Sequence, residues 1–92
     1  MGILIISVIG KDQRGILADV ATLIADIGGN IEDVRGHSIL INKGKKLASV
    51  SLIVSSEGET QPFFVRLRKK MKQLAEKYNL KITIYREEEI FD

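Results

Sequence analysis

A short polar loop bounded by two glycines holds the residues best suited to chemistry, Gly10-Lys11-Asp12-Gln13-Arg14-Gly15. It leads directly into apolar residues at helical spacing. The first amides of a helix lack internal partners and carry partial positive charge, so they attract carboxylates and phosphates. Gly15 leaves the backbone open to such an anion, and Asp12 can accept an ammonium group. Together these groups match an α-amino acid, although from the loop alone a plain N-cap at Asp12 is slightly favoured.

Asn30 is a second polar candidate, placed directly after Gly28-Gly29 at the start of an expected strand. A turn residue that tolerates left-handed φ is the favoured interpretation from this residue alone. The predicted topology puts Asn30 at the opposite end of the sheet from the loop. Only a neighbouring subunit could then bring it to Asp12.

Other reactive groups are few. The chain has no cysteine, which excludes disulfides, thiolate zinc sites, iron–sulfur clusters and a cysteine nucleophile. Its one histidine, His37, lies on an alternating strand, and the adjacent Glu32 and Asp33 are expected to point to opposite faces. We therefore predict no catalytic residue, no metal site and no cofactor, and a protein that is not an enzyme.

Six elements must position these residues, and residues 1–92 are expected to form a single domain. Hydrophobic periodicity and glycine or proline punctuation predict strands at Ile3–Ile9, Asn30–Leu40, Leu47–Val54 and Leu80–Arg86, and helices at Ile16–Ile27 and Pro62–Tyr78. A βαββαβ order predicts an α+β fold, the ferredoxin-like sandwich, with a four-stranded antiparallel sheet and two helices on one face. The first and third strands should be central.

The first strand is apolar on both sides, with Ile3, Ile5 and Ile9 on one and Leu4, Ile6 and Val8 on the other. Two helices cover only one face of such a sheet, so we expect burial of both faces to need a partner. A homo-oligomer, a dimer or higher, is the favoured interpretation.

The absence of cysteine suggests a cytoplasmic protein, and the hydropathy pattern predicts no membrane segment. The apolar run Ile3–Ile9 is too short to span a bilayer and lacks the flanks of a signal peptide. The net charge is +2, and the basic cluster of the second helix reads as a solvated face rather than a nucleic-acid surface. That cluster comprises Arg66, Arg68, Lys69, Lys70 and Lys72.

The Gly10–Leu17 segment, the helix after it and Gly28-Gly29-Asn30-Ile31-Glu32-Asp33 resemble the ACT domain family of amino-acid-sensing regulatory domains. The likeness includes small stand-alone prokaryotic members and the glycine cleavage repressor type. It implies side-by-side pairing of subunits and an amino acid bound at their interface. Carried onto this chain, the ligand-binding positions are Asp12, Gln13, Arg14, Gly15, Ile16, Leu17 and Asn30.

Three functions stay open on the sequence. The favoured hypothesis is a non-catalytic regulatory domain that senses a small amino acid at a homodimer interface and signals to a regulated protein partner. An interaction module of the same fold, without a ligand, is the alternative. An acylphosphatase-like enzyme would have to use Arg14 and Asn30 as its anion cradle, and it is the least favoured.

Overall fold

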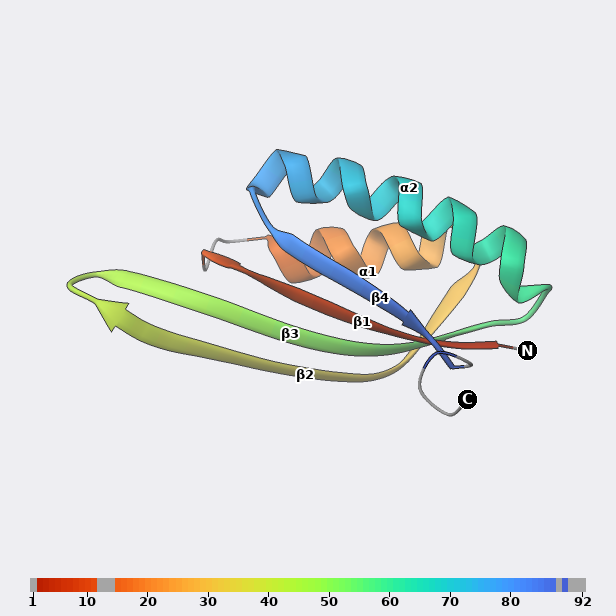
Figure 1. The fold of residues 1–92 in the computed structure, drawn as a ribbon, viewed down its shortest axis with the longest axis horizontal. Helices are drawn as coiled ribbons and strands as arrows, with labels where there is room; N and C mark the ends of the chain where they lie inside the picture. The colour runs from red at the N-terminus through yellow and green to blue at the C-terminus, as the bar shows by residue number, and fades with distance from the viewer. Residues whose placement is uncertain (1, 12–14, 88, 90–92) are drawn as a thin grey trace.

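The computed structural model describes residues 2–11, 15–87 and 89. The elements are β1 (Gly2–Lys11), α1 (Ile16–Asp26), β2 (Gly29–Asn42), β3 (Lys45–Ser56), α2 (Thr60–Tyr78) and β4 (Lys81–Arg86). The strands form one antiparallel sheet in the order β2-β3-β1-β4, and both helices lie on one of its faces (Figure 1). The predicted ferredoxin-like α+β sandwich is confirmed, with β1 and β3 in the centre.

The core lies between the helices and the two central strands. Every second residue of β1 and β3 points toward the helices, which is the period-two alternation of a strand. Buried apolar residues are Leu4, Ile6, Val8, Ile16, Val20, Ile24, Leu52, Val54, Phe63, Leu67, Met71 and Leu74. On α2 the 3,4,3,4 spacing of Phe64, Leu67, Met71, Leu74 and Tyr78 predicts one apolar stripe that begins at Phe64. In the structure Phe63 is buried and Phe64 is only half-buried.

The other face of the sheet is uncovered in a single chain. Ile3 and Ile9 are 38% and 41% exposed there in one copy. Burial of both faces of β1 therefore needs a partner, as expected from the sequence, and stays a prediction. Two helices cannot shield both faces of a sheet, and none of the described segments replaces them. The open face therefore carries apolar side chains that a single copy leaves in contact with water.

The hairpin of β2 and β3 runs well beyond the helices, as the left side of Figure 1 shows. Its turn uses Gly44 at a φ of 74°, a left-handed conformation that favours glycine. Gly36 pairs with Val50, and Ser38 pairs with Ala48, so these four positions share the face on which the helices lie. The hairpin thus forms a platform that extends past the beginning of α1.

The end of α1 is fixed by glycines of two kinds. Gly28 has a φ of 89° and its N–H donates to the Ala25 carbonyl oxygen, which closes the helix. Gly29 starts β2 under the core, where a Cβ atom would lie 2.6 Å from Phe63 Cζ and 2.8 Å from Ile24 Cγ2. The pair of glycines predicted as a helix stop therefore also allows close packing of β2 on the helices.

None of the described helices has the length and apolar content needed to cross a membrane.

We expect Gly29→Ala to lower the free energy of unfolding by about 1–3 kcal/mol, because the new Cβ must displace two core side chains. Gly58→Ala is the matched control, since a Cβ there meets nothing within 4 Å, and it should change stability by less than about 0.5 kcal/mol. Urea denaturation followed by circular dichroism measures both values. Equal stability of the two variants would contradict the packing described for Gly29.

Candidate functional site

The beginning of α1 presents open backbone. Gly15 adopts a φ of 90°, and no described side chain forms a capping hydrogen bond to the helix start. The first bond of the helix runs from the Asp19 N–H to the Gly15 carbonyl oxygen, at 2.9 Å. The amides of Ile16, Leu17 and Ala18 precede that bond and have no carbonyl partner within the helix. This end of α1 therefore offers donors and partial positive charge to an anion.

A groove of about 390 Å³ lies between the beginning of α1 and the hairpin platform. Its walls are Gly15, Ile16, Leu17, Ala18, Gly36, His37, Ser38, Ala48 and Val50. Gly15 and Gly36 contribute no side chain, and that leaves room beside the helix amides. The volume falls within the range of about 300–1,000 Å³ that is usual for small-molecule sites.

The structure brings together only some of the predicted site residues. Gly15, Ile16 and Leu17 line the groove, whereas Asp12, Gln13 and Arg14 lie outside the described residues. Asn30 pairs with Ser55, beside Ile3, so it lies on the open face at the other end of the sheet. From Ile3 to the end of β1 is roughly 25 Å at the rise of a strand.

That separation has two consequences. Within one chain Asn30 cannot reach a ligand held at the beginning of α1, as the predicted topology implied. An acylphosphatase-like cradle of Arg14 and Asn30 also loses its geometric basis, because Asn30 and the residues next to Arg14 lie at opposite ends of β1.

Six residues of the groove are absent from the site that the sequence predicts: Ala18, Gly36, His37, Ser38, Ala48 and Val50. Ala48 and Val50 are two residues apart on a predicted strand, so the sequence alone indicates that they share one face. The sequence did not predict the full length of the hairpin. β2 ends at Asn42 rather than Leu40, and β3 begins at Lys45 rather than Leu47. β1 likewise continues through Gly10 and Lys11, which had been assigned to the loop.

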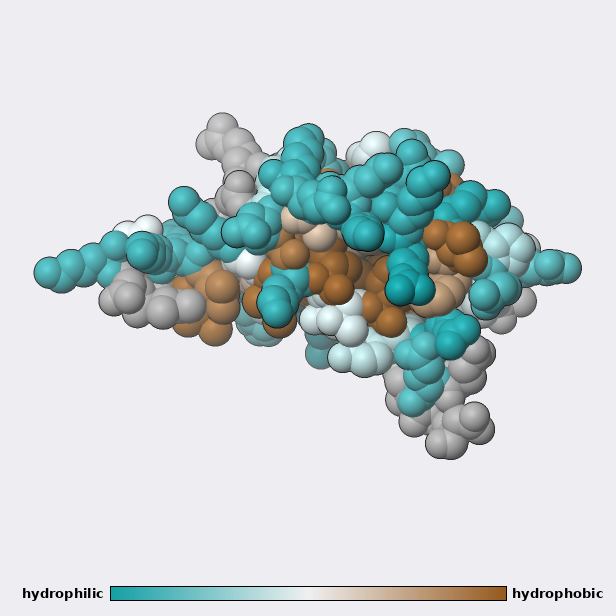
Figure 2. Space-filling view, turned by 45° about the horizontal axis from the view of Figure 1, so that its top comes forward, coloured by the Kyte–Doolittle hydropathy of each residue, from teal (hydrophilic) through white to brown (hydrophobic). Residues whose placement is uncertain are grey.

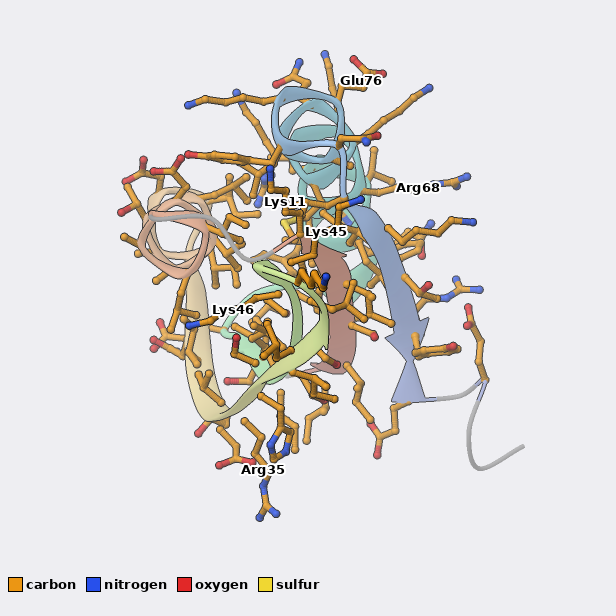
Figure 3. The ribbon with its side chains drawn as sticks, turned by 90° about the vertical axis from the view of Figure 1, so that its left-hand side faces the viewer. Lys11, Arg35, Lys45, Lys46, Arg68 and Glu76 are labelled. Atoms are coloured by element: carbon orange, nitrogen blue, oxygen red, sulfur yellow. The ribbon has the colours of Figure 1, made fainter. Side chains whose placement is uncertain are left out.

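Three lysines gather at the same end of the molecule. Figure 3 looks at this end and shows Lys11 and Lys45 at the strand ends and Lys46 on the hairpin. Lys46 pairs with Leu40 and so lies on the same face as Ala48, which lines the groove. None of the three forms an ion pair with a described residue. Their unpaired charge adds to the positive potential near the start of α1 and favours a ligand with a negative group.

A contact between the two helices fixes the beginning of α1. The hydroxyl of Tyr78, at the end of α2, donates a hydrogen bond to Asp19 Oδ2, and Lys77 Nζ lies 3.6 Å from the same oxygen. The bond from Tyr78 holds the pKa of Asp19 below its ordinary value; Lys77 lowers this pKa further and burial opposes the shift. The same bond raises the pKa of Tyr78. The first turn of α1, and with it one wall of the groove, is anchored to α2.

The carboxylates of β2 are used in local contacts. A register shift between Ile31 and Asp33 interrupts the alternation of the strand, so the expectation that Glu32 and Asp33 point to opposite faces is not met. Glu32 Oε1 accepts a 2.5 Å bond from Ser55 Oγ, and Asp33 Oδ2 lies 3.1 Å from Arg35 Nε. Among the described residues, no group of histidine, aspartate or glutamate side chains is arranged to hold a metal ion.

Comparisons with known proteins agree with this architecture. A family model described as the ACT domain matches residues 2–85. The UPF0237 protein of Streptococcus mutans is 40% identical over 80 residues, which cover 87% of this chain and 83% of that protein.

Two solved structures are similar along most of the chain. An ACT domain protein from Streptococcus pneumoniae superposes with a TM-score of 0.77 at 28% identity, covering 99% of this chain and 96% of that one. A candidate glycine cleavage system transcriptional repressor gives a TM-score of 0.73 at 22% identity, covering 92% of this chain and 45% of that one. The second likeness shows the fold alone.

We expect Tyr78→Phe to reduce the loss of stability on acidification. The pKa of Asp19 is lower in the folded state than in the unfolded state, so its contribution is complete above about pH 4 and is lost as the pH falls through the folded value. Urea denaturation between about pH 6 and about pH 3 should show a shallower decline for Tyr78→Phe than for the unsubstituted protein.

The control is Tyr85→Phe, because Tyr85 is exposed on β4 far from Asp19. This variant should keep the original pH dependence. An identical decline for the Tyr78 and Tyr85 variants would show that the contact between Tyr78 and Asp19 has no part in acid stability.

Proposed function

Because the chain belongs to the ACT domain family of regulatory ligand-binding domains, we propose that it senses a small amino acid. The observation that carries the proposal is the groove between the beginning of α1 and the β2–β3 platform, with two glycines in its walls. Its apolar floor and open helix amides suit a zwitterion with a small side chain. We propose that binding is read by a regulated protein partner.

In the proposed pose the ligand carboxylate accepts hydrogen bonds from the amides at Gly15–Leu17. Lys46 supports this polarity, because its charge lies on the same face and is not paired with a described residue. The ammonium group is assigned to Asp12, and Gln13 and Arg14 stay in the site as expectations from the sequence. The side chain of the amino acid would lie against Ala48 and Val50.

A second copy completes the site in this proposal. β2 is an edge strand of 14 residues, and a long free edge is a ready surface for pairing with another strand. Antiparallel pairing of two β2 strands places the beginning of one beside the end of the other. Asn30 of one copy would then approach the hairpin half of its partner, at the rim of the groove rather than on its floor.

An interaction module without a ligand is the second candidate function. The observation in its favour is the open face of the sheet, where Ile3, Ile9 and Ile39 are all exposed. Such a face can bind a protein whether or not the groove is occupied. The experiments below separate the two functions.

Isothermal titration calorimetry against each standard amino acid should give heat with at least one small amino acid at millimolar concentration or below. Gly36→Val should abolish this heat, because the new side chain enters the groove. A Cβ at Gly36 lies 3.8 Å from Val50 Cγ2, an ordinary contact, so the fold is expected to accept the change. Valine also suits a strand better than glycine, and stability should be unchanged or higher by up to about 1 kcal/mol.

Ser49→Val is the matched control, since it adds the same kind of side chain to the same hairpin on the open face. It should bind the amino acid as the unsubstituted protein does. The sensor proposal fails if no amino acid gives heat, and the proposed location fails if Gly36→Val binds normally.

Binding should depend on assembly, because the proposed site includes Asn30 from a second copy. Sedimentation velocity across a dilution series should show a dimer that dissociates, and the amino acid should shift that equilibrium toward the dimer. Asn30→Ala should weaken binding of the amino acid and leave the unliganded dimer intact. A monomer that binds the amino acid with full affinity would contradict the shared site.

A further inference from the structure

A second groove, of about 690 Å³, lies on the other edge of the sheet, between α2 and β4. It is separate from the candidate amino-acid site, and the two share no residue. In Figure 2 an apolar band runs along the molecule beneath the hydrophilic surface of α2. The groove is lined by Phe64, Arg68, Met71, Lys72, Ala75, Leu80, Lys81, Ile82, Thr83, Ile84, Arg86 and Glu89.

The floor of this groove is apolar and only partly covered. Ile82 and Ile84 point toward the helices from β4, and Phe64 faces them from α2. All three pack against the core but stay half-buried. They are positioned to take further apolar side chains at the place where a fifth strand would lie beneath α2.

β4 offers a backbone as well as a floor. It is the last strand in the order β2-β3-β1-β4 and pairs only with β1 among the described residues. The N–H and C=O groups along its outer side can therefore pair with an added strand. Extended peptides bind to such edges by main-chain hydrogen bonds, and adjacent pockets select their side chains.

The rim of the groove is strongly basic. Arg68 and Lys72 extend from α2, Lys81 and Arg86 belong to β4, and Glu89 is the one acidic residue among the lining residues. Glu89 Oε1 lies 2.8 Å from Arg86 Nε, so one basic residue of the rim already forms an ion pair with a carboxylate of the same chain. Arg68 projects outward from α2 on the side of β4, as Figure 3 shows. No ion pair with a described residue engages Arg68, Lys72 or Lys81.

We propose that this groove binds an extended acidic segment of a partner protein, which pairs with β4 as a fifth strand. Apolar side chains on one face of the segment would fill the floor at Ile82, Ile84 and Phe64. On the face toward α2, the segment would also carry acidic side chains that meet Arg68 and Lys72. On the opposite face, an acidic side chain would meet Lys81, which pairs with Ile9 and lies on the open side of the sheet. The pattern that this surface selects is therefore an acidic strand with apolar residues at some of the positions facing α2, because successive side chains of a strand point to opposite faces.

Charge excludes the simplest other occupant, the same edge of a second copy. Two β4 strands pairing with each other would bring two basic rims together, and like charges across a strand pair are destabilising. β2 carries charges of both signs, with Asp33 and Arg35 paired at 3.1 Å, and it has no such barrier. The two edges of the sheet thus differ in the partner that they accept.

The rim is less suited to a nucleic acid. Proteins that bind single strands without sequence preference stack bases on free aromatic rings. Phe64 is the aromatic residue of this groove, and the guanidinium of Arg86 lies 5.0 Å from the centre of its ring. A free strand edge above an apolar floor is matched to a peptide backbone instead.

Fluorescence anisotropy with a short labelled glutamate peptide that carries valine at every fourth position tests the proposal on the full chain. Its valines and the glutamates midway between them share one face of the strand, so both can face α2. Arg68→Glu with Lys72→Glu should weaken binding by about tenfold or more, which corresponds to about 1.4 kcal/mol. Arg66→Glu with Lys70→Glu is the matched control: it makes the same charge change at the same spacing on α2, outside the groove. This control should stay within about threefold of the unsubstituted protein, because exposed charges at a distance are screened.

A second pair of peptides tests strand pairing. Methylation of alternate backbone nitrogens leaves the charge unchanged and removes hydrogen-bond donors, so the methylated peptide should lose most of its affinity. A peptide with lysine in place of glutamate should not bind. The proposal is overturned by equal weakening in both double variants, by full binding of the methylated peptide, or by single-stranded DNA that binds more tightly and displaces the acidic peptide.

Binding of this peptide does not require the amino-acid site. Gly36→Val should therefore keep its affinity for the acidic peptide, whereas the variant with Arg68→Glu and Lys72→Glu should keep its response to the amino acid. Failure of one proposal can thus be distinguished from failure of the other.

Discussion

The difference in length between strands and helices determines most of the surface of this protein. The 11 residues of α1 span about 17 Å, whereas the 14 residues of β2 span about 46 Å. The helix cannot cover the strand, so the hairpin extends beyond it and leaves a groove where α1 begins. The same two helices also leave the second face of the sheet open. Both proposed roles of this chain, ligand binding and pairing with a partner, arise where its helices fail to cover its sheet.

The hydrophobic pattern predicted the fold because each element carries its own period. Strand alternation and helical spacing gave the element order, and the order with right-handed crossovers gave the sheet. The sequence-based predictions were wrong at positions where tertiary contacts determine which of two adjacent residues is buried or how a strand pairs. Phe63 rather than Phe64 is buried, because the direction of α2 over β1 selects one of two adjacent aromatic residues. The register shift at Glu32 has no signal in residue type, since the bulge depends on pairing with β3.

The candidate site was only partly predictable for a similar reason. Gly15, Ile16 and Leu17 follow from the sequence, because a helix start next to a glycine can be recognised locally. The opposite wall, Gly36 and Ser38, comes from a strand distant in sequence, and its position depends on how far the hairpin extends. Asn30 lies at the other end of the sheet, and it would join the site only from a second copy, as proposed. Local sequence patterns identified the wall of the candidate groove that the beginning of α1 forms. They missed the wall on the hairpin, because tertiary packing brings it to the helix.

Amide NMR tests the central claim most directly, that a small amino acid binds at the beginning of α1. In a titration of the labelled protein with the amino acid that gives heat in calorimetry, the largest shift changes should fall on Ile16, Leu17 and Ala18 and on Gly36 across the groove. Shift changes confined to β4 and the facing side of α2, or spread over the open face of the sheet, would contradict the account.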